Sequence, residues 1–345
     1  MNNLIKNIKD VEQLENMLST PSQRLVEFIK KLKGDILILG VGGKIGPSLA
    51  QMAKRAAEKA GVEKRIVGVS LFESEDDQKK VAALGIETIH GDLLDRIFLS
   101  KLPKLENVIF MAGMKFGSVD NLSLTWAINS YLPALVAEEF KDSKIVAFST
   151  GCVYPLVPVS GGGSTEKDIP EPIGEYAQSC LGRERMFEYG SSKYKTPAAI
   201  IRLNYAIDMR YGVLVDVAQK VKNNQPVDVT MGFANMIWQG DANDMILRSL
   251  GICESPAKIL NVTGPETVSI RWVVKRFGEL MNKKVEIVGL ESETALLGNA
   301  SLCHRLFGYP KVALDQMILW ITDWIQSDRA LLDKPTHFEV RDGKY

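Results

Sequence analysis

A glycine-rich segment near residue 40 has the residue types of a turn that can bind a phosphate group. It reads Gly40-Val41-Gly42-Gly43-Lys44-Ile45-Gly46 and comes directly after the apolar run 35–39 (DILIL). Glycines permit a tight turn and let backbone N–H groups approach an anion, whose charge the N-terminus of a following helix also stabilises. The strand–turn–helix context that we expect here favours a pyrophosphate site for a dinucleotide; the alternative is a tight turn without a ligand.

Short apolar runs alternate with amphipathic stretches through the first two thirds of the chain. Beyond the run at 35–39, strands are predicted at 65–69, 87–89, 107–111, 144–149 and 198–203. Helical segments between successive strands require crossover connections, which favours an α/β fold with a Rossmann-type doubly wound parallel sheet. After residue 205 the alternation loosens, with a shorter strand predicted at 259–262, and we expect a smaller C-terminal α/β substrate lobe.

This pattern divides the chain into three expected parts. Residues 1–33 form an N-terminal helical arm that packs on the core, or alternatively makes an oligomer contact or a lid. Residues 34–205 form the NAD(P)-binding Rossmann domain, and residues 206–345 form mostly the substrate-binding lobe. The loop 155–174 is long and rich in glycine and proline, as functional lids often are.

The composition limits the classes of partner. Lys plus Arg and Asp plus Glu each number 42, so the net charge is zero, which argues against nucleic-acid and membrane-surface binding. No apolar run approaches the roughly 20 residues that span a bilayer, and residues 1–10 lack the order of a secretion signal. The four cysteines show no C-x-x-C spacing, so we expect no metal site and a reducing, cytoplasmic location.

From the glycine segment onward, the order of motifs resembles the extended short-chain dehydrogenases/reductases, and within them the NAD-dependent epimerase/dehydratase family. The glycine spacing fits G-x-x-G-x-x-G, and residues 90–95 (HGDLLD) resemble the family's G-D-L-x-D segment. Residues 108–117 (VIFMAGMKFG) are similar to a segment of the UDP-galactose 4-epimerases. Residues 148–154 (FSTGCVY) resemble the S-[ST]-x-x-V-Y stretch. Matches in this order are more specific than any single motif.

The resemblance implies a site for NAD or NADP, in which Asp92 touches the adenine and Lys115 the phosphates. The residues that it assigns to this site are Gly40, Gly42, Gly43, Lys44, Ile45, Gly46, Ser70, Asp92, Leu93, Ala112, Gly113, Lys115, Asn129, Tyr176 and Tyr205. The choice of coenzyme stays open. Ser70 stands where NAD-preferring enzymes usually have an acidic residue, and it can accept a ribose hydroxyl or donate to a 2′-phosphate. Lys44 either adds charge for that phosphate or is a solvated lysine.

The same resemblance places Thr150 at the catalytic Ser/Thr position and Tyr176 at the acid/base position of a hydride transfer. The family's lysine, four residues after the tyrosine, is replaced here by Cys180. Cys180 could be a tolerated apolar replacement in an altered site, a thiol in a proton relay, or one half of a redox pair with Cys152. A tyrosine without a nearby cation has a pKa of about 10 and suits proton donation.

Helical spacing offers a substitute for the missing cation. Tyr176, Cys180 and Arg183 are at positions i, i+4 and i+7, hence on one face of a helix. Arg183 could supply the charge, or it could form a surface or inter-helix ion pair with Glu184 or a neighbour. Lys115 is the other candidate.

We therefore expect an NAD(P)-dependent oxidoreductase or epimerase that acts on a sugar, sugar acid or nucleotide sugar. A dehydratase is less favoured, because Gly151 and Cys152 stand where dehydratases have an acidic pair. The alternative, suggested by Cys180, is a catalytically weakened NAD(P)-binding regulatory or scaffold protein. The resemblance also implies a homodimer, and it places residues 235–241 along the substrate cleft, with Trp238 either in the core or as a sugar-stacking platform.

Overall fold

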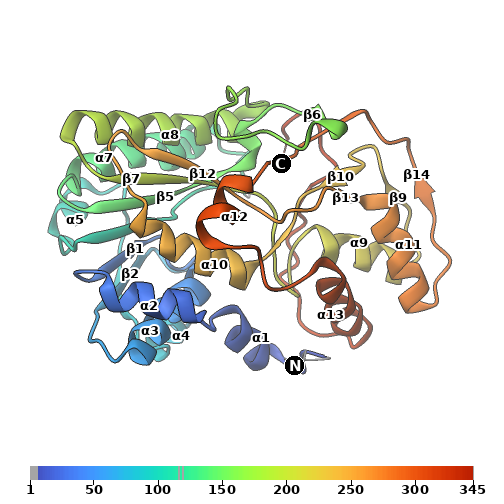
Figure 1. The fold of residues 1–345 in the computed structure, drawn as a ribbon, viewed down its shortest axis with the longest axis horizontal. Helices are drawn as coiled ribbons and strands as arrows, with labels where there is room; N and C mark the ends of the chain where they lie inside the picture. The colour runs from blue at the N-terminus through green and yellow to red at the C-terminus, as the bar shows by residue number, and fades with distance from the viewer. Residues whose placement is uncertain (1–6, 116, 119, 345) are drawn as a thin grey trace.

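The computed structural model describes residues 7–115, 117–118 and 120–344. Two lobes lie side by side, with the large sheet in one and the helices α9, α11 and α13 in the other (Figure 1). In the described part of the chain, no helix is long and apolar enough to cross a membrane.

A seven-stranded sheet forms the centre of the first lobe, in the order β12-β7-β5-β4-β1-β2-β3. Every pairing in it is parallel. The strands are β1 (Ile36–Leu39), β2 (Ile66–Ser70), β3 (Glu87–His90), β4 (Asn107–Phe110), β5 (Lys144–Thr150), β7 (Ala198–Leu203) and β12 (Lys258–Val262). The order runs outward from β1 in both directions, which confirms the predicted doubly wound Rossmann-type sheet. It also places a switch point between β1 and β4, where such sheets bind ligands at the carboxyl ends of the strands.

The central strands are apolar throughout because helices cover both faces of the sheet. All four residues of β1 and of β4 are buried. One face packs against α2, α3 and α10, and the other against α5, α7 and α8 (Figure 1). The helices of this lobe are α2 (Gln23–Lys31), α3 (Gly46–Ala60), α4 (Glu75–Ala83), α5 (Arg96–Lys101), α6 (Leu122–Trp126), α7 (Leu132–Glu139), α8 (Gly174–Tyr194), α10 (Gln239–Arg248) and α12 (Ser301–Phe307).

A π-helical turn, Ala127–Tyr131, joins α6 to α7. Asn129 lies in this turn and is fully buried. Such wide turns are rare and are frequently found at functional sites.

The second lobe has its own apolar core, built from α9 (Val213–Lys222), α11 (Ile270–Met281) and α13 (Leu314–Gln326). Two-stranded pairings surround it, formed by β6 (Val157–Pro158), β8 (Ala206–Ile207), β9 (Val227–Asp228), β10 (Phe233–Ala234), β11 (Ile237–Trp238), β13 (Val268–Ser269), β14 (Ile287–Val288) and β15 (Thr294–Ala295). Although β12 comes later in the sequence than most of these elements, it belongs to the large sheet of the first lobe.

Both ends of the chain connect the two lobes. In the N-terminal arm, α1 (Val11–Leu18) buries Leu14 and Leu18 in the core of the second lobe, whereas α2 buries Leu25 and Ile29 against the large sheet. After α13 the C-terminal segment, residues 329–344, returns between the lobes, and the C-terminus lies there in Figure 1.

Candidate functional site

A cavity of about 570 Å³ lies at the carboxyl ends of β1, β4, β5 and β7, over the switch point. The predicted residues that line it are Gly42, Gly43, Lys44, Ile45, Gly113, Lys115, Thr150, Tyr176 and Tyr205. Those outside its lining are Gly40, Gly46, Ser70, Asp92, Leu93, Ala112, Asn129 and Cys180. The fold thus brings the glycine turn and the predicted catalytic pair to one cavity, although they are over a hundred residues apart in sequence.

The glycine turn is compact on its inner side and open toward the cavity. A Cβ on Gly46 would overlap the Val41 carbonyl oxygen, so the turn tolerates only glycine there. At Gly43 a Cβ would meet only the Gly40 carbonyl oxygen, at 3.6 Å. No side chain caps the N-terminus of α3, where the Gly46 N–H donates to the Gly43 carbonyl and Pro47 has no N–H, so the end of the helix dipole is open toward an anion. These features form a cradle for an anion.

The far end of the cavity lies at the carboxyl end of β2. Ser70 ends this strand, and its hydroxyl would be 2.7 Å from a Cβ on Gly42. Glu73 and Asp77 line the cavity here, together with Phe72. Of the predicted adenine-side residues, Asp92 lies beyond β3 and accepts from the Leu94 N–H. Leu93 is buried in the core.

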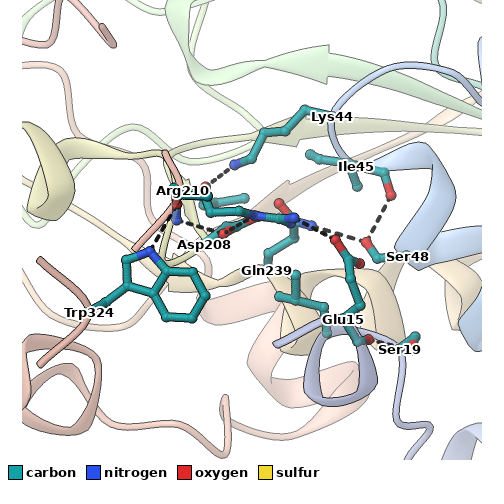
Figure 2. Close-up of polar contacts among 12 residues, drawn as sticks. Glu15, Ser19, Lys44, Ile45, Ser48, Asp208, Arg210, Gln239 and Trp324 are labelled. Atoms are coloured by element: carbon teal, nitrogen blue, oxygen red, sulfur yellow. Dashed lines mark hydrogen bonds and ion pairs between the residues drawn. The ribbon is translucent and has the colours of Figure 1, made fainter. Parts of the chain in front are cut away.

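Lys44 extends from the turn toward the second lobe (Figure 2). Its ammonium group donates to the Ala206 carbonyl at 3.1 Å and lies 4.2 Å from the centroid of the Tyr211 ring. The prediction of a solvated surface lysine was therefore wrong, because the ammonium group is bonded inside the protein. That Lys44 adds charge for a 2′-phosphate stays a prediction.

Burial lowers the pKa of Lys44 to about 8, against an opposing effect of the Asp208 carboxylate. Arg210 and Lys115 lower it further by charge repulsion. Asp208 is itself held by the Arg210 guanidinium, which also reaches the Glu15 carboxylate of α1 at 2.7 Å (Figure 2). Through Glu15, the N-terminal arm thereby fixes the Arg210–Asp208 pair that lies beside Lys44.

The predicted catalytic residues lie together at the end of β5 and the start of α8. The Thr150 hydroxyl accepts the Cys152 N–H at 3.1 Å, which leaves its own proton to donate. The Tyr176 hydroxyl is hydrogen-bonded to the Cys180 thiol. Burial raises the pKa of Tyr176 well above its ordinary value, and that of Cys180 to about 11. A thiol that keeps its proton is a poor partner for a redox pair.

Arg183 lies beneath this pair. Its guanidinium donates to the Asn129 side chain at 2.6 Å and to the Phe148 carbonyl at 3.0 Å, and its Nε is buried without a hydrogen bond. A Cβ on Gly113, at the cavity wall, would lie 2.6 Å from its Nη2 atom. The positive charge of Arg183 lowers the pKa of both Tyr176 and Cys180.

The expected alternative, an ion pair between Arg183 and Glu184, is wrong because Glu184 pairs with Arg202. The carboxylate lies 2.6 Å from Arg202 Nη2, and both side chains are almost fully buried. Glu184 also accepts from Ser149 at 2.5 Å, while Arg202 donates to the Tyr154 hydroxyl at 2.8 Å. This network ties α8 to β5 and β7 directly beneath Thr150.

Asn129 acts within the protein rather than at the cavity wall. Its Oδ1 atom accepts from the Met114 N–H and from Arg183, and its Nδ2 atom donates to the Met114 carbonyl and the Ser179 hydroxyl. These four bonds use its full hydrogen-bonding capacity. Asn129 therefore fixes the loop after β4 against α8.

Sequence reasoning missed several residues of the cavity. Leu332, Lys334 and Thr336 come from the C-terminal segment, and Tyr211 from the loop after β8. No motif marks the C-terminal segment, so only the folded chain could assign it to the site. Residues 235–241 do not line the cavity, and Trp238 is a core residue that packs against Trp320 with ring centroids 5.5 Å apart.

The strand order and the cleft at the switch point define a Rossmann-type α/β protein. Neither a protein-family model nor a curated protein sequence matches the chain. Solved structures match its fold over 85% of its length. Pal from Bacillus thuringiensis is 19% identical, with a TM-score of 0.69 over 99% of that chain.

Two further matches are named as enzymes. UDP-glucuronic acid 4-epimerase from Bacillus cereus, solved with UDP-glucuronic acid and NAD, is 17% identical, with a TM-score of 0.69 over 99% of that chain. DesIV, a dTDP-glucose 4,6-dehydratase from Streptomyces venezuelae solved with NAD and TYD, is 16% identical, with a TM-score of 0.72 over 97% of that chain. The chain has the fold of the NAD-dependent epimerase/dehydratase family, as the sequence resemblance predicted.

Proposed function

We propose that this protein is an NAD-dependent enzyme that transfers hydride to or from a carbon bearing oxygen in a sugar, sugar acid or nucleotide sugar. The observation that carries the proposal is that one cavity holds the glycine turn at one place and Thr150 and Tyr176 at another. The matching structures with NAD and nucleotide sugars support the same class of reaction.

The turn fits a dinucleotide, because Gly43 is open to the cavity and the turn leads directly into the N-terminus of α3, whose dipole favours an anion. Its N–H groups would hold the pyrophosphate, and Ser70 would accept a ribose hydroxyl. Glu73 and Asp77 favour NAD over NADP, because their carboxylates repel a 2′-phosphate. NAD, when bound, accepts or returns the hydride.

Tyr176 is the proton donor in this proposal. Its raised pKa keeps the phenol protonated at neutral pH, which suits donation to a carbonyl oxygen and favours the reductive direction. Thr150 donates its hydroxyl proton to the same substrate oxygen and orients it. Arg183 acts as a positioning residue: its charge lies where the family's lysine is missing, and it limits the rise in the pKa of Tyr176.

We propose that the chain forms a homodimer, and the helices beside the π-helical turn and α8 expose apolar side chains that such an interface would bury. Trp126 and Tyr131 lie around the π-helical turn, and Tyr189 lies on α8, with exposures of 37%, 50% and 59%. We propose that this surface pairs two copies of the chain, as light scattering after gel filtration would test.

Titration calorimetry with NAD and NADP tests the cofactor site, and NADH fluorescence during mixing with sugars and sugar acids tests the reaction. We expect NAD to bind more tightly than NADP, and Tyr176→Phe to abolish the redox change while it keeps NAD binding. If neither coenzyme binds, the proposal fails. Tight binding with no redox change would favour the second candidate, a cofactor-binding regulatory protein, which is suggested by Cys180 in place of the lysine.

A further inference from the structure

The C-terminal segment forms the wall of the cavity that faces the second lobe. Leu332, Lys334 and Thr336 line the cavity, whereas no residue of 213–331 does. The helices and strands of the second lobe that fall in this range therefore do not contact the cavity, and the segment lines it in their place. A substrate beside Tyr176 would contact the segment and the loop after β8 rather than the helices of the second lobe.

The segment is anchored by its own polar and apolar contacts. The Thr336 N–H and hydroxyl both donate to the Asp216 carboxylate of α9, at 2.8 and 2.5 Å. Phe338 is buried in the core of the second lobe, and the Leu332 N–H donates to the Arg210 carbonyl. These contacts hold Lys334 between two fixed points.

Further along, Arg341 anchors the segment to β15 of the second lobe, where it donates to the carbonyl and the hydroxyl of Thr294, at 2.8 and 2.7 Å. The segment then reaches the first lobe. The Gly343 carbonyl oxygen lies so close to Gly174 that it would overlap a Cβ there, and Gly174 begins α8 two residues before Tyr176. The wall is therefore a bridge between the lobes, packed at both ends.

The space that remains is small. The cavity of about 570 Å³ is of the size that holds one ligand of drug size, roughly 300–1,000 Å³. A dinucleotide that extends from Gly43 to Tyr176 would fill much of it. The rest is lined by Tyr176, Tyr211 and Lys334, and no residue of 213–331 lines a place for a nucleotide attached to the substrate.

The cavity is also divided by charge. Its lining carboxylates, among the residues that the structure describes, are Glu73 and Asp77 at the β2 end. Lys44, Lys115 and Lys334 line it elsewhere, and the charge of Lys115 lowers the pKa of Lys44. The substrate half of the cavity therefore attracts anions.

We propose that the substrate is a small anion without a nucleotide, the size of a single sugar, whose carboxylate or phosphate is bound by Lys334 together with Lys44. This inference rests on the proposed function, since it needs the dinucleotide in the other half of the cavity. It makes the C-terminal segment the element that decides which substrates enter.

Titration calorimetry on the NAD-loaded protein tests it with four probes: D-glucuronate, glucose 6-phosphate, D-glucose and UDP-glucuronate. We expect one or both small anions to bind at least about tenfold more tightly than glucose, and UDP-glucuronate not to bind. Glucuronate alone would identify a carboxylate site, and glucose 6-phosphate alone a phosphate site.

Lys334→Met should lower the affinity for the small anions at least about tenfold, and Lys334→Arg should retain it. Lys30→Met on the exposed side of α2 is the matched control and should change nothing. NAD binding is measured first in every protein, because it distinguishes the two proposals. If the wild-type protein does not bind NAD, the proposed function itself fails. With NAD bound, the inference is overturned if UDP-glucuronate binds more tightly than the small anions, if neither small anion binds, or if Lys334→Met leaves their affinities unchanged.

Discussion

The Tyr176 hydroxyl is hydrogen-bonded to the Cys180 thiol one turn further along α8. Burial raises the pKa of each group, so both are neutral near pH 7. The cation beneath them is Arg183, at the next turn of the same face. Burial therefore keeps the proton on Tyr176, and the nearby groups that adjust its pKa are a thiol and a guanidinium, where the resembling family uses a lysine.

Cys180→Lys should shift the pH–rate profile of alcohol oxidation to lower pH. An ammonium group beside Tyr176 stabilises the phenolate, lowers the pKa of Tyr176, and so supplies the base at a lower pH. The measurement is the initial rate of NADH formation against pH, with Cys180→Ser as the neutral control. A profile that matches the wild type would show that the missing cation does not limit the reaction.

Arg183→Met should shift the same profile to higher pH, because the charge that lowers the pKa of Tyr176 is lost. Arg183→Lys should keep most of the wild-type profile. Both variants leave Asn129 and the Phe148 carbonyl short of donors, so each should lose about 1–3 kcal/mol of unfolding free energy. If the Arg183→Met and Arg183→Lys variants had the same pH–rate profile, the role of Arg183 would be structural only.

Gly43→Ala should weaken NAD binding without lowering the melting temperature, because its methyl group enters open space on the cavity side of the turn. Gly46→Ala is the opposite case. Its Cβ would overlap the Val41 carbonyl oxygen, so the fold itself should lose stability. Calorimetry measures the NAD affinity of the two variants and thermal melts measure their stability. Together they distinguish a glycine needed for ligand binding from one needed for the fold. An unchanged NAD affinity in Gly43→Ala would place the pyrophosphate elsewhere.

Lys44→Met should stabilise the protein near pH 7. The pKa of about 8 in the folded protein lies below the ordinary value of 10.5, so the unfolded chain binds more protons between these values. The penalty for burying the charge is complete below pH 8 and disappears as the pH rises toward 10.5. We expect a gain of about 1–3 kcal/mol at pH 7, discounted for partial exposure of the side chain. Urea unfolding at pH 7 and pH 10 measures it, and a gain that does not shrink with pH would contradict the assigned cause.

Much of the fold is predictable because its signal is local. The buried strands of a parallel sheet are continuous apolar runs, such as 36–39 and 198–203, and the glycine turn lies directly between a strand and a helix. The sequence also predicts the strand that the structure has at 258–262. Its place at the edge of the large sheet depends on pairing with β7, which no local pattern encodes.

The site is predictable where a motif carries the chemistry, and not where distant segments meet. Motifs identify Thr150 and Tyr176, and the cavity contains both. The direction of the Lys44 side chain depends on Ala206 and Tyr211, far along the chain. Lys334 has no signature of its own, because an exposed lysine and a cavity lysine look alike in sequence.

The π-helical turn at Ala127–Tyr131 has one more consequence. Its extra residue lets Asn129 and Ser130 face α8 together, where both bond to Ser179. Deleting one residue there would convert the turn to regular helix and rotate the rest of α7 by about 100°, one residue's share of a 3.6-residue turn. Asn129 could then no longer bond to both Met114 and Arg183, so a regular helix would leave the candidate site less ordered.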